Sequence, residues 1–183
     1  VMEVMGRDAG WIALNAAIAG GAHVCLIPEM RYRIEPIAAA IAKRKAAGHP
    51  YSIVVIAEGA KPLDGEQSLL GPRALGEMPR LFGAAHKLAT GLERLTDLEV
   101  RVTVLGHLQR GGSPIQFDRV LGTRFGVAAV DCIAQGKFGY MVALRTPDIV
   151  TVPISEAIGH KREVDPEGQL VRTGRDIGIC FGD

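Results

Sequence analysis

Residues 101–119 decide how this chain is interpreted, because they join an apolar run to a glycine pair and several basic side chains. They read Arg101-Val-Thr-Val-Leu-Gly-His107-Leu-Gln-Arg110-Gly-Gly-Ser-Pro-Ile-Gln-Phe-Asp118-Arg119. The β-branched run from Val100 to Leu105 predicts a buried strand that stops at Gly106. The Gly-Gly-Ser-Pro sequence predicts a tight loop, and a helical pattern begins near Ile115.

Polar side chains follow directly after this predicted strand. His107, Gln109 and Arg110 would lie at its carboxyl end. In open α/β sheets, ligands bind outside the carboxyl ends of the strands. A guanidinium offers a planar fork of donors, and glycines let backbone N–H groups approach an anion. The pattern therefore indicates a phosphate-binding site at the end of a strand.

Strands and helices alternate on the N-terminal side of this stretch. Such alternation predicts βαβ units and a parallel sheet. Residues 60–79, rich in proline, glycine and charge, predict a surface excursion of uncertain structure. The predicted strands cover residues 1–5, 22–27 and 52–57, and the predicted helices run from Trp11 to Gly20, from about Pro36 to Gly48, and from Leu81 to Leu95.

The C-terminal side predicts shorter elements. A long helix is expected over residues 116–135 and a short helix over residues 154–161. Strands are expected over residues 140–144, 148–152 and 177–181, and residues 163–175 are expected to be polar and mobile.

Bulk composition excludes several classes of protein. With 183 residues, 48% apolar and 22% charged, the chain predicts a folded domain, and a net charge of +1 predicts no binding to nucleic acid. Three cysteines in separate apolar runs predict reduced thiols and a cytoplasmic protein. No apolar run approaches the roughly 18 residues of a membrane span, so no membrane partner is expected. The chain starts at Val1 inside an apolar run, and we expect it to be a fragment.

Two other strand ends carry candidate ligands. Gly6-Arg7 follows the first predicted strand, where backbone N–H groups and a guanidinium favour an anion. Glu58 ends the third predicted strand, where a carboxylate can accept hydrogen bonds from sugar hydroxyls. By pattern alone, Arg7 could mark an ordinary turn, and Glu58 could be a solvated or helix-capping acid. Glu29 also ends a strand, and we interpret it as structural.

Residues 101–119 resemble the signature of the 6-phosphofructokinases. In order, that signature has a basic residue, four unspecified residues, a small residue, His, one unspecified residue, Gln-Arg-Gly-Gly, five unspecified residues, an acidic residue and Arg. Residues 101–119 match every specified position. Met5-Gly6-Arg7 resembles the Met-Gly-Arg motif of the same family. The resemblance covers almost the whole chain but only the C-terminal half of the family. The nucleotide-binding glycines and the Thr-Ile-Asp-x-Asp segment of the N-terminal half do not occur in this sequence.

The resemblance implies a fold and a division into parts. It implies a three-layer α/β/α Rossmann-like parallel sheet over residues 1–112, which would bind the sugar phosphate. Residues 113–160 would cross back and pack on the N-terminal domain. In a fragment that lacks this domain, their apolar face would be exposed to water. Residues 161–183 would form a tail with a short last strand.

The resemblance also implies an activity. Members of the family phosphorylate the 1-hydroxyl of fructose 6-phosphate in glycolysis, and the phosphoryl donor is ATP or pyrophosphate with Mg²⁺. Their N-terminal half mainly binds the donor and the Mg²⁺. The expected partners are fructose 6-phosphate, the chain's own N-terminal half, and other copies in a dimer or tetramer. No metal is assigned to side chains of this chain. An alternative is a non-catalytic, sugar-phosphate-binding or regulatory subunit of the same family.

Residue roles follow from matching positions of the motifs. The Met5 and Gly6 backbone would contact the sugar, Arg7 would stabilise the transferred phosphoryl group, and Glu58 would bind a fructose hydroxyl. His107 and Arg110 would bind the 6-phosphate and sugar of their own subunit, with His107 as a hydrogen-bond donor rather than a base. Arg101 would reach the substrate of a neighbouring subunit. The full expected set is Met5, Gly6, Arg7, Glu58, Arg101, His107, Leu108, Gln109 and Arg110.

Overall fold

A computed structural model describes residues 1–69, 81–159 and 161–183 of the chain. The chain forms two compact units, of which the first comprises residues 1–110 with 163–183 and the second comprises residues 111–162. The predicted surface excursion over residues 60–79 falls partly outside the described residues.

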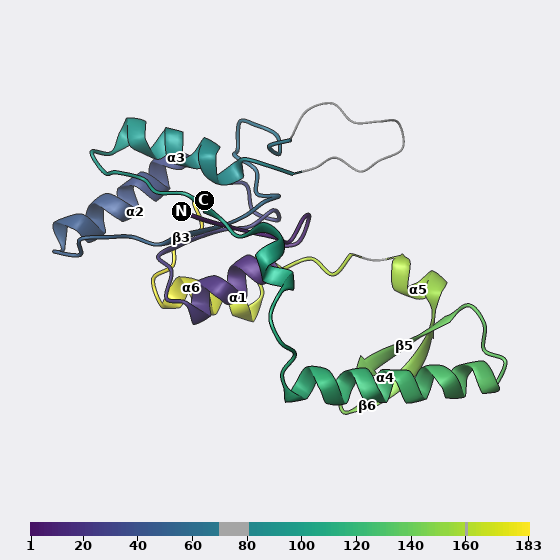
Figure 1. The fold of residues 1–183 in the computed structure, drawn as a ribbon. Helices are drawn as coiled ribbons and strands as arrows, with labels where there is room; N and C mark the ends of the chain where they lie inside the picture. The colour runs from purple at the N-terminus through teal and green to yellow at the C-terminus, as the bar shows by residue number, and fades with distance from the viewer. Residues whose placement is uncertain (70–80, 160) are drawn as a thin grey trace. The chain divides into compact units, whose positions relative to one another are not determined.

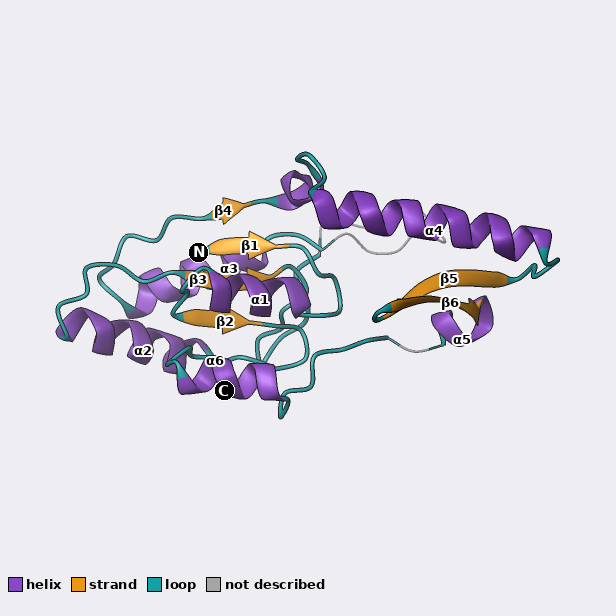
Figure 2. Cartoon of the chain, turned by 90° about the horizontal axis from the view of Figure 1, so that it is seen from below, coloured by secondary structure: helices purple, strands orange, loops and turns teal. Residues whose placement is uncertain are grey.

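The first unit is built on a parallel sheet of four strands in the order β2-β3-β1-β4 (Figure 2). Met2 of β1 lies beside Val55 of β3 and Thr103 of β4, and Val24 of β2 lies beside Val54. Because the strands are parallel, their carboxyl ends meet at one edge of the sheet. The strands are β1 Met2–Val4, β2 Val24–Leu26, β3 Val54–Ala57 and β4 Thr103–Val104.

Helices cover both faces of this sheet (Figure 1). Helices α1 and α6 pack together on one face, and α2 and α3 pack together on the other. The predicted α/β class with a Rossmann-like parallel sheet is therefore confirmed. The helices are α1 Trp11–Ala19, α2 Ile34–Ala46, α3 Ala84–Leu95 and α6 Gln169–Asp176.

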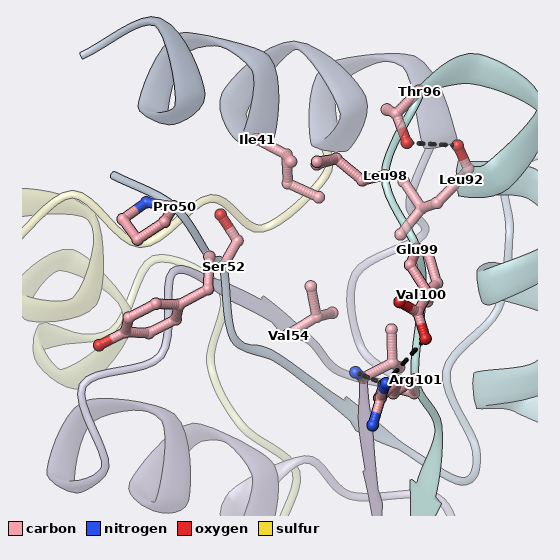
Figure 3. Close-up of a pocket in the computed structure, with 12 residues that line it drawn as sticks. Ile41, Pro50, Ser52, Val54, Leu92, Thr96, Leu98, Glu99, Val100 and Arg101 are labelled. Carbon is pink, nitrogen blue, oxygen red and sulfur yellow. Dashed lines mark hydrogen bonds and ion pairs between the residues drawn. The ribbon is translucent and has the colours of Figure 1, made fainter. Parts of the chain in front are cut away.

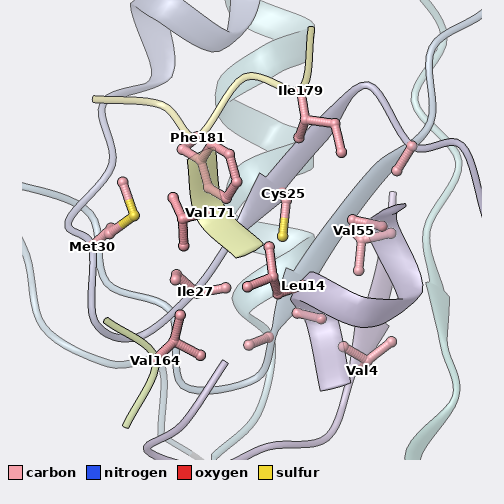
Figure 4. Packing of buried hydrophobic residues seen from close by; sticks show 14 residues of the cluster. Val4, Leu14, Cys25, Ile27, Met30, Val55, Val164, Val171, Ile179 and Phe181 are labelled. Atoms are coloured by element: carbon pink, nitrogen blue, oxygen red, sulfur yellow. The ribbon is translucent and has the colours of Figure 1, made fainter. Parts of the chain in front are cut away.

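Both faces of β3 are buried, which explains its continuous apolar sequence. Val55 and Ala57 belong to the core on the α1 side, whereas Val54 and Ile56 belong to the core on the α2 and α3 side. Figure 4 shows the α1-side core, in which Cys25 lies among aliphatic side chains. Burial, with a smaller effect from Glu29, raises the pKa of the Cys25 thiol to about 12. All three cysteines are free.

The strand predicted over residues 100–105 is shorter and more exposed than expected. Only Thr103 and Val104 form β4, and both are exposed. Strand β4 is the last in the sheet order, so it has a neighbour on one side only. The apolar residues around it are half-buried: Val100 and Val102 pack toward α2 and α3, and Leu105 packs toward α1. The apolar run from Val100 to Leu105 therefore lies at the edge of the sheet and is not an inner, fully buried strand.

The predictions for residues 163–181 were wrong in two respects. Residues 169–176 form α6, with Val171 buried against the α1-side core, although they were expected to be polar and mobile. In place of a strand over residues 177–181, a single parallel bridge joins Cys180 to Val24 at the edge of β2. Phe181 is 1% exposed because it enters the core beside Gly174, where a Cβ would lie 3.0 Å from the Phe181 ring.

The second unit contains a helix, a hairpin and a short helix. The strands β5 and β6 are antiparallel, with Tyr140 opposite Pro153 and Arg145 opposite Asp148. Helix α4 packs against both strands, yet Cys132 is its only buried residue. Val127, Val130 and Ile133 of α4 are all exposed, and the predicted packing of residues 113–160 on an N-terminal domain stays a prediction. The elements are α4 Gln116–Ala134, β5 Tyr140–Arg145, β6 Asp148–Pro153 and α5 Ile154–Ile158.

Within the described ranges, no helix is both long enough and apolar enough to cross a membrane.

His23 predicts a pH dependence of stability. The Ile53 N–H donates to His23 Nδ1 at 2.8 Å, which requires an unprotonated nitrogen. Burial, followed by the charges of Arg44 and His49, lowers the pKa of His23 below its ordinary value of 6.5. The unfolded chain therefore binds more protons near pH 6, so this contribution is present above pH 6.5 and is lost as the pH falls below it.

The substitution His23→Asn keeps an acceptor near the Nδ1 position but does not titrate. We expect its free energy of unfolding, measured with urea at pH 7.5 and pH 5.5, to fall less on acidification than that of the unmodified protein. An equal loss in both proteins would assign the pH dependence to other groups.

Candidate functional site

A cleft of about 920 Å³ lies at the carboxyl ends of β1, β3 and β4, within the first unit. Its lining joins segments that are far apart in the sequence. It also combines cationic, carboxylate and apolar side chains. The lining residues are Glu3, Val4, Met5, Gly6, Arg7, Ile12, Glu58, Leu81, Phe82, Val104, Gly106, His107, Gln109 and Arg110.

The turn after β1 brings backbone groups into this cleft. Gly6 and Arg7 have φ angles of 149° and 53°, so the chain leaves the extended conformation abruptly. The Arg7 N–H donates to Glu58 Oε1 at 3.1 Å, and the Glu58 N–H donates to the Val4 carbonyl at 2.9 Å. The ends of β1 and β3 are thereby held together by hydrogen bonds.

A close approach fixes the same turn. The Arg7 carbonyl oxygen lies so near Gly59 that a Cβ on Gly59 would be 1.7 Å from it. Gly59 is buried, and the neighbouring Gln67 Nε2 donates to its carbonyl at 3.1 Å. A side chain at position 59 is therefore incompatible with the observed path of the turn.

The segment after β4 supplies the other side of the polar lining. Gly106–Arg110 forms the 3₁₀-helix η1, which follows β4 in the chain. Gln109 links it to β1, because the Met5 N–H donates to Gln109 Oε1 at 3.3 Å while Gln109 Nε2 donates to the Gly106 carbonyl at 3.2 Å. His107 and Arg110 are exposed and line the cleft, so both are accessible to a ligand.

The cleft brings together seven of the nine predicted site residues: Met5, Gly6, Arg7, Glu58, His107, Gln109 and Arg110. Leu108 does not line it, and its side chain is 79% exposed. In the 3₁₀-helix, neighbouring side chains point in different directions, which separates Leu108 from His107 and Gln109.

Arg101 also lies outside this cleft. It precedes β4, forms an ion pair with Glu99 at 3.0 Å, and lines a smaller pocket of about 150 Å³ (Figure 3). The remaining lining is largely apolar and includes Ile41, Leu92 and Val54. The predicted contact of Arg101 with the substrate of a neighbouring subunit stays a prediction.

Sequence reasoning missed part of the lining. Glu3 interrupts the apolar run Val1-Met-Glu-Val-Met, and a lone acid in a buried strand is a signal that could have identified it. Leu81 and Phe82 come after the segment 70–80, and Ile12 projects from α1. Their positions depend on tertiary packing, and no local pattern indicated them.

The arrangement suits an anionic, hydroxylated ligand. Arg7, His107 and Arg110 can donate hydrogen bonds to a phosphate, and Glu58 can accept hydrogen bonds from hydroxyl groups. Ile12 and Phe82 add apolar surface to the same cleft. A few polar groups on an otherwise apolar lining are typical of small-molecule sites.

The residues of the cleft do not fit a protein-held Mg²⁺ site. Throughout residues 1–69, 81–159 and 161–183, no group of three or more His, Cys, Asp or Glu residues could hold a metal ion. Glu3 and Glu58, the carboxylates in the cleft, accept hydrogen bonds from the backbone N–H groups of Ala85 and Arg7.

Fold and cleft together define an α/β protein with a cleft at the carboxyl ends of its parallel strands, the position where proteins of this class bind ligands. A family model described as Phosphofructokinase matches residues 1–133. The chain belongs to the phosphofructokinase family.

Curated relatives cover this chain completely. The ATP-dependent 6-phosphofructokinase of Chloroflexus aurantiacus is 52% identical over 183 residues, which are 100% of this chain and 50% of that protein. The pyrophosphate–fructose 6-phosphate 1-phosphotransferase of Streptomyces coelicolor is 49% identical over 184 residues, or 100% of this chain and 52% of that protein. The chain therefore spans about half the length of the curated relatives it matches.

Solved structures agree with this assignment. The phosphofructokinase of Saccharomyces cerevisiae superposes with a TM-score of 0.67 and 30% identity, covering 85% of this chain and 20% of that chain. The pyrophosphate-dependent phosphofructokinase of Marinobacter aquaeolei has a TM-score of 0.73 and 23% identity, covering 100% of this chain and 48% of that chain, and this likeness shows the fold alone.

Gly59→Ala tests the close approach that shapes the cleft. We expect it to lower the free energy of unfolding by about 1–3 kcal/mol, because backbone atoms of Arg7 must move to admit a methyl group. Urea unfolding measures this change. Gly122→Ala in α4 is the matched control, because a Cβ there meets open space, and stability should stay equal or rise by up to about 1 kcal/mol. Equal effects of the two substitutions would contradict the constraint at Gly59.

Proposed function

We propose that this chain is the C-terminal, sugar-phosphate-binding part of a 6-phosphofructokinase. The observation that supports the proposal is the cleft in which Arg7, Glu58, His107 and Arg110 meet from three separate segments. Membership of the phosphofructokinase family, with relatives named for both ATP and pyrophosphate, supports it further.

In the proposed complex, the cleft holds fructose 6-phosphate. Arg110 and His107 donate hydrogen bonds to the 6-phosphate, and Glu58 accepts hydrogen bonds from the sugar hydroxyls. The backbone at Met5 and Gly6 contacts the sugar. The hydrogen bond between the Arg7 N–H and Glu58 supports this arrangement, because it holds two of the ligand-binding segments in register.

Arg7 acts on the group that is transferred. The 1-oxygen of the sugar forms a bond to the terminal phosphorus of the donor, while the bond from that phosphorus to the leaving phosphate oxygen breaks. The guanidinium of Arg7 stabilises the negative charge on the moving phosphoryl group. The proton of the 1-hydroxyl passes to a base, and we assign that base to the part of the relatives that this chain does not span.

We assign the donor and its Mg²⁺ to the same part of the relatives, which this chain does not span. Relatives about equally similar to this chain are named for ATP and for pyrophosphate, so the donor class stays open between these two. Magnesium would shield the donor phosphates, and the cleft residues of this chain serve the sugar phosphate. A role in glycolysis supports the proposal that the protein is cytoplasmic.

Exposed apolar side chains support packing against the other half of the protein. In the second unit, Val127, Val130 and Ile133 of α4 are more than half exposed. They follow one another at intervals of three residues along the helix, so large apolar groups lie next to one another in water, which is unusual. Covering them with the remaining half of the chain would remove them from water. Assembly into a dimer or tetramer, with Arg101 reaching a neighbouring subunit's substrate, belongs to the same proposal.

An assay of the full-length protein tests the proposed function. Formation of fructose 1,6-bisphosphate from fructose 6-phosphate is measured with ATP and with pyrophosphate in parallel. Turnover with either donor supports the enzyme. Saturable binding of fructose 6-phosphate without turnover would instead favour the non-catalytic, regulatory subunit, and the absence of binding would refute both.

Arg110→Ala should weaken fructose 6-phosphate binding in the full-length enzyme. The loss of a charged hydrogen bond is expected to cost about 1.5–3 kcal/mol, which raises KM by about tenfold or more. Steady-state kinetics give the value. Arg172→Ala is the control, because Arg172 is an exposed arginine of α6 outside the cleft, and its KM should not change. An unchanged KM in Arg110→Ala would remove Arg110 from the site.

Arg7→Ala should mainly lower kcat, because the proposed contact strengthens as charge develops on the transferred phosphoryl group. The comparison of kcat and KM with those of the unmodified enzyme decides the role. A rise in KM with kcat retained would place Arg7 in ground-state binding of the sugar phosphate.

A further inference from the structure

Glu3 is a buried acid in an inner strand of the sheet. Glu3 is 3% exposed, and every other charged residue of the described chain is more exposed. Strand β1 has β3 on one side and β4 on the other, a position that normally holds apolar residues. Burying a carboxylate is costly unless it gains hydrogen bonds. Glu3 therefore needs a partner that its own strand does not supply.

The partner is the first turn of α3. The Ala85 N–H donates to Glu3 Oε2 at 2.8 Å. Helix α3 begins after Gly83, whose φ of 84° lies in the left-handed region and which provides no side-chain cap. The first N–H groups of a helix lack partners within the helix, and a side-chain oxygen usually satisfies one of them. Here that oxygen comes from a residue 82 positions earlier in the chain.

The first turn of α3 in turn locates one wall of the cleft. Leu81 and Phe82 come just before Gly83, the residue after which α3 begins, and both line the cleft together with Glu3. The Phe82 ring stacks on His86 in the first turn of α3, with 6.4 Å between the ring centroids. The Phe82 N–H also donates to the Ser68 carbonyl at 3.0 Å. A shift of the first turn would therefore carry the Phe82 ring with it.

We propose that Glu3 is a positioning residue that holds the first turn of α3 and thereby fixes the Leu81–Phe82 wall of the cleft for the sugar phosphate. The inference rests on the proposed function, since the wall matters only if a sugar phosphate occupies the cleft. A hexose has apolar C–H surface besides its hydroxyls, and an aromatic ring such as Phe82 offers a matching apolar face. Small displacements of groups that position a substrate can cost much of its productive binding.

Three substitutions in the full-length protein test this role. Glu3→Leu removes the acceptor for the Ala85 N–H, whereas Glu3→Gln keeps an amide oxygen that can accept the same bond. Phe82→Ala removes the ring itself, and because Phe82 is 49% exposed, this variant should fold even if Glu3→Leu does not. Val171→Ala in α6 is the control, because it truncates a buried side chain that does not line the cleft.

Hydrogen exchange and kinetics are measured on each variant. In Glu3→Leu, exchange of the amides at residues 84–86 should accelerate about tenfold or more, and KM for fructose 6-phosphate should rise about threefold to tenfold while kcat stays within about twofold. In Glu3→Gln, the exchange rates and KM should both stay close to those of the unmodified protein. Phe82→Ala should raise KM without changing the exchange of α3. Val171→Ala should lower the thermal unfolding midpoint and leave KM unchanged.

Different failures have different meanings. If Glu3→Leu left hydrogen exchange at residues 84–86 unchanged from the unmodified protein, the claim that Glu3 holds the first turn of α3 would be wrong. If Glu3→Leu showed faster exchange but an unchanged KM, or if Phe82→Ala left KM unchanged, the Leu81–Phe82 wall would not contribute to binding the sugar phosphate. If the unmodified protein neither bound nor phosphorylated fructose 6-phosphate, the proposed function would fail, while hydrogen exchange would still decide whether Glu3 holds α3.

Discussion

The site depends on the contact between the turn after β1 and the end of β3. One hydrogen bond joins the Arg7 N–H to Glu58, and the Arg7 carbonyl passes directly over Gly59. The two residues that follow β3 thus meet different requirements of the same turn: position 58 must carry an acceptor, and position 59 must lack a side chain. Together they place a guanidinium and a carboxylate, 51 residues apart, in one cleft.

Parallel strands make this convergence possible. Each of β1, β3 and β4 delivers its following residues to the same edge of the sheet, so that segments distant in sequence share a cleft without a long-range pairing motif. Strand β3 needs only apolar sequence, because helices cover both of its faces. Structural and ligand-binding demands are separated along the chain: apolar residues form the strands, and polar residues follow at their ends. Glu3, a polar residue within a strand, departs from this division.

Much of the site could be predicted from the sequence because its signals are local. The apolar run ending at Ala57 predicted that Glu58 lies at a strand end, and Gly106 marked the equivalent end for His107 and Arg110. The C-terminal region was harder to predict, since α6 carries few apolar residues and is held by Val171 and by the fit of Phe181 beside Gly174. Phe82 could not be placed either, because its position depends on contacts with Ser68 and His86 rather than on a local pattern.

The bridge between Cys180 and Val24 has a consequence for solubility. Strand β2 ends the sheet order, and its outer backbone groups would otherwise offer a template for a strand of another molecule. Cys180 covers this template, because its carbonyl accepts from the Cys25 N–H at 2.9 Å and its N–H donates to the His23 carbonyl at 3.0 Å. The opposite boundary, β4, is only two residues long and offers little length for such pairing. Loss of the segment around Cys180 would thus expose the unpaired backbone groups of β2 and favour intermolecular aggregation, even with every cleft residue intact.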